Sequence, residues 1–184
     1  MTLKQIALGV IGTLAALGGS NVALADSSAA KMKNCPAEDW CFYHREADKS
    51  WSHSPLAQIN ASNVKNLRPA WIFQPGNVRM GMHSTPLAVG GNMYVATNPS
   101  TVTKLNGATG AVMWQWVPKL DEAVVARSFF AHTRGLAIGD GRVYMGTVDG
   151  RFVALNESDG KVMWEKQMVD SKKDTVGFSG AATF

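Results

Sequence analysis

Two stretches of the chain decide the fold: GNMYVATNPSTVTKLNGATGAVMW at residues 91–114 and GRVYMGTVDGRFVALNESDGKVMW at residues 141–164. They align without a gap at a spacing of 50 residues, and nine of their 24 positions are identical. Unrelated sequences would match at far fewer positions, so the chain contains an internal repeat. A period of this length is typical of solenoids and propellers.

Each repeat unit predicts four short strands. Small apolar and β-branched residues alternate with turns rich in Gly, Asp and Asn, and neither unit shows helical periodicity. The expected strands cover residues 85–89, 93–97, 101–105 and 112–116, and then 135–138, 143–147, 151–155 and 162–166. Four short strands repeated every 50 residues are typical of β-propeller blades, so the predicted fold class is all-β.

A glycine and a tryptophan recur at the end of each unit, as Gly110 with Trp114 and as Gly160 with Trp164. The tight turn before the last strand needs positive φ, which glycine adopts without steric cost. The large apolar ring of the tryptophan suits packing over a neighbouring blade. We therefore assign these four residues a structural role and not a catalytic one.

The segments that flank the repeat indicate export and an incomplete ring. Residues 1–25 resemble an export signal, with Lys4 at the start, an apolar run at 6–17 and Ala23-Leu24-Ala25 before the expected cleavage site. Residues 26–77 would hold a capped short helix at 60–67 and a ring-closing strand at 70–74. Residues 78–184 would form two blades and the first strand of a third. Two blades cannot close a ring, so we expect a longer periplasmic protein.

Composition and cysteine usage limit the class of protein. The 184 residues are 46% hydrophobic and 17% charged, with a formal net charge of +4. These values argue against disorder, and without a long Lys/Arg run we do not expect nucleic-acid binding. Export makes a disulfide between Cys35 and Cys41 possible, and we favour it over two free thiols. The chain has no Cys-x-x-Cys-His for a c-type haem and no second Cys or His pair for zinc.

Several motifs resemble the dehydrogenases that depend on pyrroloquinoline quinone (PQQ), which include methanol, ethanol and membrane glucose dehydrogenases. The similar stretches are WSHSPLAQIN at 51–60, NVKNLRPAW at 63–71, STPL at 84–87, TRG at 133–135 and GTVDGRFVAL at 146–155. The resemblance runs from residue 39 to the C-terminus. The opening motif and the DGR stretch are specific, whereas the glycine–tryptophan repeats also mark PQQ-type propellers that bind no PQQ.

The resemblance implies a PQQ-type β-propeller with eight blades in the complete family, of which about two blades and one strand are present here. PQQ would lie in the central funnel beside a calcium or lanthanide ion. The substrate would be an alcohol, sugar or polyol, and the electron acceptor cytochrome c or ubiquinone. The family's catalytic base and metal ligands have no counterpart in this chain. We therefore expect the isolated polypeptide to be inactive without the remaining blades.

The resemblance also implies four cofactor contacts. Arg134 falls on the family arginine near the reactive carbonyl of PQQ, and a guanidinium stays cationic there. His83 replaces a family glutamate, and Ser179 replaces a threonine. The adjacent cysteines of the alcohol dehydrogenases are missing before Arg134. His132 resembles, with a different spacing, a histidine that the membrane glucose dehydrogenases place nearby.

Two other interpretations remain open from the sequence. One is a non-enzymatic PQQ-like propeller that serves as a scaffold or binding protein of the cell envelope. The missing lipid-anchor cysteine, the opening motif and Arg134 argue against it. The other is a fragment without function. PQQ binding by the complete protein would distinguish the first two interpretations.

Overall fold

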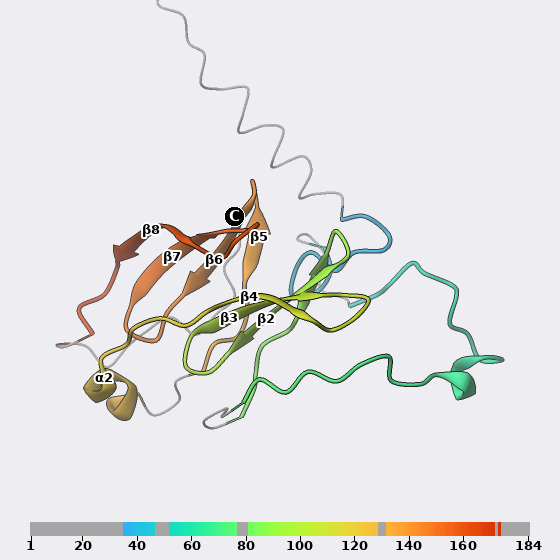
Figure 1. Cartoon of the computed structure of the whole chain (residues 1–184), viewed down its shortest axis with the longest axis horizontal. Coiled ribbons are helices and arrows are strands. Elements are labelled where there is room, and N and C mark those ends of the chain that lie inside the picture. The colour runs from blue at the N-terminus through green and yellow to red at the C-terminus, as the bar shows by residue number, and fades with distance from the viewer. Residues whose placement is uncertain (1–34, 47–51, 77–80, 129–131, 172, 174–184) are drawn as a thin grey trace, which may run out of the picture.

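The computed structural model describes residues 35–46, 52–76, 81–128, 132–171 and 173. Its main body consists of two antiparallel sheets of four strands each, which lie side by side (Figure 1). Blade 1 contains β1 (Leu87–Val89), β2 (Asn92–Thr97), β3 (Thr101–Asn106) and β4 (Val112–Trp116). Blade 2 contains β5 (Ala137–Gly139), β6 (Arg142–Gly146), β7 (Arg151–Asn156) and β8 (Val162–Gln167).

Both blades have the simplest antiparallel topology, in which each strand pairs with the next one in sequence. The strand registers repeat as well: Leu87 pairs with Tyr94 in blade 1, and Ala137 pairs with Tyr144 in blade 2. All eight strands lie within two residues of the bounds expected from the repeat, and the all-β fold class is confirmed.

A single apolar core joins the two blades. Tyr94 and Val102 of blade 1 and Val143 and Leu155 of blade 2 belong to the same buried cluster, and each of these four side chains is 0% exposed. Burying one such side chain contributes about 1.5–3 kcal/mol. The two sheets therefore stabilise each other across their facing surfaces.

The tryptophan–glycine pairs connect successive segments of the chain. Trp114 of β4 packs on the turn of blade 2, where its indole Nε1 donates to the carbonyl of Glu157 at 3.0 Å. A Cβ on Gly160 would lie 2.6 Å from the Trp114 ring. Trp71 packs on Gly110 in the same way, and a Cβ on Gly110 would also lie 2.6 Å from the ring. Trp164 of β8 is 42% exposed, so the described residues do not cover it.

The segment before the blades differs from the sequence-based expectation. Residues 52–76 run out from the sheets and back (Figure 1) and contain only a short 3-10 helix, η1 (Val64–Asn66). Residues 70–74 form no ladder with any described strand. The ring-closing strand expected there would pair with a blade outside this chain, so it stays a prediction. Within the described residues, packing of Trp71 on blade 1 holds this stretch.

One helix was not expected from the sequence. Helix α2 (Glu122–Arg127) lies between the two blades in sequence, and the Asp121 side chain caps it by accepting from Ala123 N at 2.9 Å. The described residues include no helix long and apolar enough to cross a membrane. The expected export signal at 1–25 and the expected strand at 177–184 lie outside the described residues.

The first described residues are tied to blade 1. A disulfide joins Cys35 and Cys41, with their Cα atoms 5.8 Å apart. Between them, Trp40 forms an antiparallel bridge with Ala88, so a short piece of chain pairs with the inner edge of β1. Asp39 adds a contact by accepting from Gly90 N at 3.1 Å.

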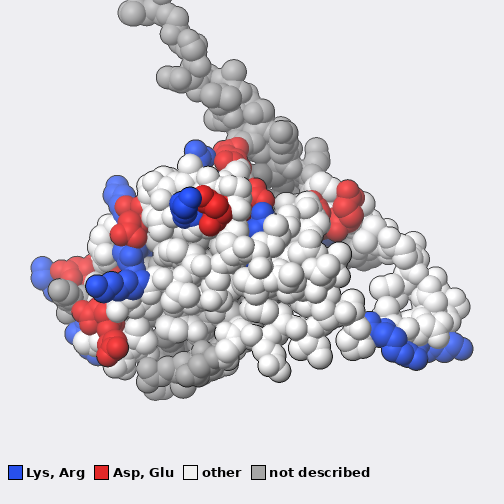
Figure 2. Space-filling model, viewed as in Figure 1, with Lys and Arg blue, Asp and Glu red and all other residues white. Residues whose placement is uncertain are grey.

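The charged side chains are scattered. On the face shown in Figure 2, they form small groups of both signs with broad uncharged areas between them. The described residues on this face therefore form no continuous positive surface.

Candidate cofactor-binding loops and the polar network beside them

Three loops come together where the inner strands of the two blades begin. Residues 81–86 lead into β1, residues 98–100 connect β2 to β3, and residues 132–136 lead into β5. The Asn98 amide joins all three loops: its Nδ2 donates to Gly81 O at 2.6 Å, and its Oδ1 accepts from Thr133 N at 2.8 Å. Asn98 is 3% exposed, so this connection is shielded from water.

Two of the four predicted cofactor contacts, His83 and His132, lie against each other. Their ring centroids are 3.9 Å apart, with an angle of 35° between the planes. His132 is 5% exposed, whereas His83 is exposed at the surface of its loop. The structure therefore brings together two histidines that are separated by 49 positions in the sequence.

Arg134 lies two residues after His132 and is exposed, so its guanidinium is available to a ligand. Beside the histidines, the hydroxyls Ser84 Oγ and Thr133 Oγ1 are buried without a hydrogen-bond partner among the described residues. A buried hydroxyl without a partner is costly and often marks a site that a ligand completes. Ser179, the fourth predicted contact, lies outside the described residues.

The donor set of these loops fits an anionic, oxygen-rich cofactor. Arg134 offers a permanent positive charge, the two hydroxyls can donate to oxygens, and an imidazole can donate a hydrogen bond. PQQ carries carboxylates and quinone oxygens, so these residues fit it. A metal ion fits less well: no group of three or more His, Cys, Asp or Glu side chains that could hold one occurs in the described part of the chain.

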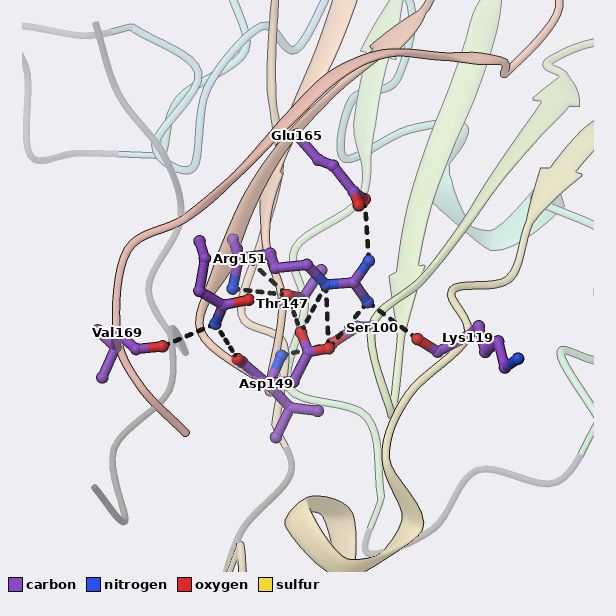
Figure 3. A network of polar contacts seen from close by, with 9 residues as sticks. Ser100, Lys119, Thr147, Asp149, Arg151, Glu165 and Val169 are labelled. Atoms are coloured by element: carbon purple, nitrogen blue, oxygen red, sulfur yellow. Dashed lines mark hydrogen bonds and ion pairs between the residues drawn. The ribbon is translucent and has the colours of Figure 1, made fainter. Parts of the chain in front are cut away.

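A second polar arrangement lies in the turn between β6 and β7 (Figure 3). Arg151 Nη2 pairs with Asp149 Oδ2 at 2.8 Å, and Arg151 Nη1 pairs with Glu165 Oε2 at 2.9 Å. Arg151 Nη2 also donates to the carbonyl of Lys119 at 3.0 Å, and the Thr147 hydroxyl donates to Asp149. The guanidinium therefore ties the β6–β7 turn to β8 and to the segment that follows β4.

This network is structural. Burial lowers the pKa of Arg151, but its hydrogen bond and ion pair with Asp149, helped by Glu165, outweigh burial and raise the pKa. All three nitrogens of the guanidinium contact protein oxygens, which leaves the group little capacity for a ligand. Gly150 is required here, because φ is +80° and an added Cβ would lie 2.9 Å from Val169 O.

The network also touches the candidate cofactor-binding loops. Val148 N donates to the Ser100 hydroxyl at 2.8 Å (Figure 3), and Ser100 belongs to the same turn as Asn98. The turn between β2 and β3 thus contacts the corresponding turn of blade 2 on one side. It holds the histidine loops on the other.

A third polar cluster lies on the contact between the blades. The Tyr94 hydroxyl donates to Glu157 Oε1 at 2.5 Å, and Lys104 Nζ lies 3.6 Å from the same oxygen. Burial, then the hydrogen bond and the charge of Glu157, raise the pKa of Tyr94 well above its usual range. Lys104 Nζ also lies 5.3 Å from the centroid of the Tyr94 ring. These residues stabilise the contact between the blades.

The sequence did not indicate the role of Asn98. Its partners Gly81 and Thr133 are 17 and 35 positions away, and no local pattern reports such distances. A usable signal was the departure from the repeat, since blade 2 has Val148 at the equivalent position.

Comparisons with known proteins identify the family. Residues 40–173 match the family model described as "PQQ: Glucose/ethanol/alcohol dehydrogenase, beta-propeller domain". The chain belongs to this family. The resemblance and the propeller fold expected from the sequence are confirmed.

Individual relatives agree with this family. The dehydrogenase subunit of the quinone-dependent alcohol dehydrogenase of Gluconobacter oxydans is 40% identical over 127 residues, which are 68% of this chain and 16% of that protein. The lanthanide-dependent methanol dehydrogenase of Methylorubrum extorquens is 38% identical over 86% of this chain and 26% of its own length. A europium-containing methanol dehydrogenase structure aligns with a TM-score of 0.73 and 33% identity, over 85% of this chain and 27% of that one.

These relatives are oxidoreductases, and their names connect them with quinones, alcohols and, in two cases, a lanthanide. The chain spans about a sixth to a quarter of the length of these relatives. The match therefore describes the family and the propeller fold of this part.

Proposed function

We propose that this chain contributes the first propeller blades of a periplasmic PQQ-dependent dehydrogenase that oxidises an alcohol, sugar or polyol. The family match over residues 40–173 is the observation that carries this proposal. The dehydrogenase names of the relatives support an alcohol as the first substrate class to test. The gathering of His83, His132 and Arg134 into adjacent loops supports a cofactor site on these blades.

Each residue of the loops has a defined role in the proposal. Arg134 binds a cofactor oxygen and keeps its charge at any physiological pH. The hydroxyls of Ser84 and Thr133, which are buried without described partners, donate to cofactor oxygens. His83, which is exposed, donates a hydrogen bond to a cofactor carboxylate or carbonyl. His132 packs behind the ring of His83 and limits its orientation. When bound, PQQ supplies a quinone that accepts hydride from the alcohol.

The remaining parts of the site belong to the rest of the proposed enzyme. We propose that a calcium or lanthanide ion and a catalytic base are held by residues beyond the two blades. Electrons would then pass to cytochrome c or ubiquinone. The 184-residue polypeptide alone would not turn over, because it would hold the cofactor from one side only.

A test of this proposal starts from the native product. A blot of a periplasmic extract with an antibody against blade 1 should detect a band several times larger than the roughly 17 kDa expected of the 184-residue chain without its signal, at typical residue mass. The complete product, purified and loaded with PQQ and either calcium or lanthanum, should then reduce an artificial dye when an alcohol is added. A native band of about 17 kDa, or a full-length product that binds no PQQ, would contradict the proposal.

Variants connect the activity to the proposed site. Arg134→Gln should weaken PQQ binding strongly because it removes the permanent positive charge of the loops. Arg68→Gln is the matched control, because Arg68 is exposed in the N-terminal segment and, within the described part of the chain, donates to the nearby carbonyls of Lys65 and Leu67. Equal losses in the two variants would remove Arg134 from the proposed site.

A further inference from the structure

We propose that Asn98 is a positioning residue for the cofactor site. Its side-chain amide fixes the position of the loop of His83 relative to the loop of Arg134. This inference rests on the proposed function, since it assigns PQQ binding to these loops. Asn98 lies in the turn between β2 and β3 and need not touch the cofactor itself.

Two hydrogen bonds of the Asn98 side chain have different chemistry, and both are short. Nδ2 donates to the Gly81 carbonyl at 2.6 Å, and Oδ1 accepts from the Thr133 amide at 2.8 Å. One planar group therefore connects a residue two positions before His83 with the residue directly before Arg134. A primary amide can satisfy an acceptor and a donor at the same time, through two different atoms of one rigid group.

The two hydrogen bonds of Asn98 are buried, so water cannot replace them when they are lost. Asn98 is 3% exposed and Thr133 is 2% exposed. Loss of the amide would leave the buried Thr133 N–H without this acceptor, which is more costly than losing a solvent-exposed bond. The loops would then shift to satisfy their backbone groups, and the cofactor contacts would shift with them.

The contact between the histidine rings depends on the same alignment. His83 is two residues from Gly81, and His132 is adjacent to Thr133, so the amide bridge and the ring contact connect the same two loops. The 3.9 Å ring separation leaves little tolerance for a displacement of either loop. Displacements of about 1 Å at a binding site can cost about 100-fold in function.

The repeat shows that a blade does not need asparagine at this position. Blade 2 has the equivalent turn with Val148, whose side chain can form no hydrogen bond. That turn is closed by Asp149 and Arg151 instead. The side chain of Asn98 is therefore used for contacts outside its own blade turn.

The test uses the complete gene product with Asn98→Val, which introduces the residue of blade 2, and Asn98→Asp, which keeps the acceptor and loses the donor. Asn92→Val is the matched control, because Asn92 is the first residue of β2, the strand that leads to Asn98, and its side chain donates to the Gly90 carbonyl within its own hairpin. The PQQ dissociation constant is measured by fluorescence quenching. Amide hydrogen exchange is measured on the protein without PQQ for the segments around residues 81–87 and 132–136.

We expect Asn98→Val to raise the PQQ dissociation constant by about 10- to 100-fold, as the loss of a buried hydrogen-bond acceptor would. Asn98→Asp should have a smaller effect, and Asn92→Val none. With PQQ at saturation, kcat should change little, because the same contacts re-form once the cofactor is bound. Hydrogen exchange should become faster in both loops of Asn98→Val before PQQ is added.

Unchanged PQQ affinity in Asn98→Val, with only a lower unfolding free energy, would overturn the inference and leave the proposed function intact. If the wild-type protein binds no PQQ, the proposed function fails, and the exchange data decide the inference separately. Faster exchange in both loops would then support a positioning role of Asn98 for these loops. Unchanged exchange would exclude that role.

Discussion

Blade 1 and blade 2 have the same strand order and nearly the same register, but they use equivalent positions for different purposes. Position 104 is a buried lysine in blade 1, and the equivalent position 154 is a buried alanine in blade 2. The turn between the second and third strands holds the histidine loops in blade 1. In blade 2 it is closed by an arginine and two carboxylates.

This comparison separates what a blade requires from what it can vary. Both blades keep the glycine of the outer turn, the tryptophan of the outer strand and the apolar alternation of the middle strands. Two of the positions that differ, Asn98 and Lys104, use their side chains for contacts outside blade 1. At these two positions the difference between the blades corresponds to a specific contact, whereas the shared glycines and tryptophans belong to the fold.

The largest expected effect tests the shared part of the comparison. Gly160→Ala places a Cβ 2.6 Å from the Trp114 ring at a φ of +71°, so packing and backbone strain both destabilise it. We expect a loss of about 2–5 kcal/mol in the free energy of unfolding. Urea denaturation of the complete product measures it.

Gly141→Ala is the matched control for this change. Its φ is +68°, but no atom lies within 4 Å of the added Cβ. Gly141→Ala should lower the free energy of unfolding only by the cost of backbone strain, about 1–2 kcal/mol. Equal losses for the two variants would show that the tryptophan contact adds nothing.

A smaller effect is expected where the blades differ. Arg151→Gln removes the pairs with Asp149 and Glu165, and the Arg151 and Asp149 side chains are only 16% and 13% exposed. We expect a loss of about 1–3 kcal/mol in the free energy of unfolding, also measured with urea.

Lys161→Gln is the control, because the Lys161 side chain is 83% exposed and its pair with Asp159 lies in solvent. A solvent-exposed pair contributes little, so no measurable loss is expected. If Arg151→Gln is as stable as Lys161→Gln, the network in Figure 3 does not stabilise blade 2.

The smallest expected effect is a dependence on alkaline pH. Burial, followed by the hydrogen bond and charge of Glu157, raises the pKa of Tyr94. Above pH 10, the phenol ionises in the unfolded chain and stays protonated in the folded one. The free energy of unfolding should therefore fall as pH rises, by at most about 1.4 kcal/mol per pH unit.

Tyr94→Phe should flatten this fall, and Tyr144→Phe, at the equivalent position of blade 2, serves as the control. The measurement is urea denaturation at several pH values from 9 upward. An identical pH dependence in wild type and Tyr94→Phe would contradict the assignment of the effect to Tyr94.

The sequence predicted the blades well because their pattern is local and repeated. Period-two alternation and the turn glycines appear twice, so each unit supports the interpretation of the other. The strand expected at 70–74 stays a prediction, because apolar alternation cannot report whether a neighbouring strand exists. Helix α2 was missed because it is short and falls outside the repeat.

The candidate site was predictable only in part. The family resemblance indicated Arg134, His83 and His132 as residue types in a motif context. The contact between the two histidine rings depends on how the two blades pack, which no local pattern contains. Asn98 acts through backbone groups on two other loops, and its departure from the repeat was the only trace in the sequence.

The packing of Trp114 on Gly160 has a consequence for how the chain folds as it is made. Gly160, on which the ring packs, is synthesised 46 residues after Trp114. At a synthesis rate of about 5–20 residues per second, the Gly160 turn is made about 2–9 seconds after Trp114. Blade 1 therefore has an apolar surface that is open during that interval. The blades are therefore completed in order from the N-terminus, since the tryptophan of each blade is covered only when the next blade has been made.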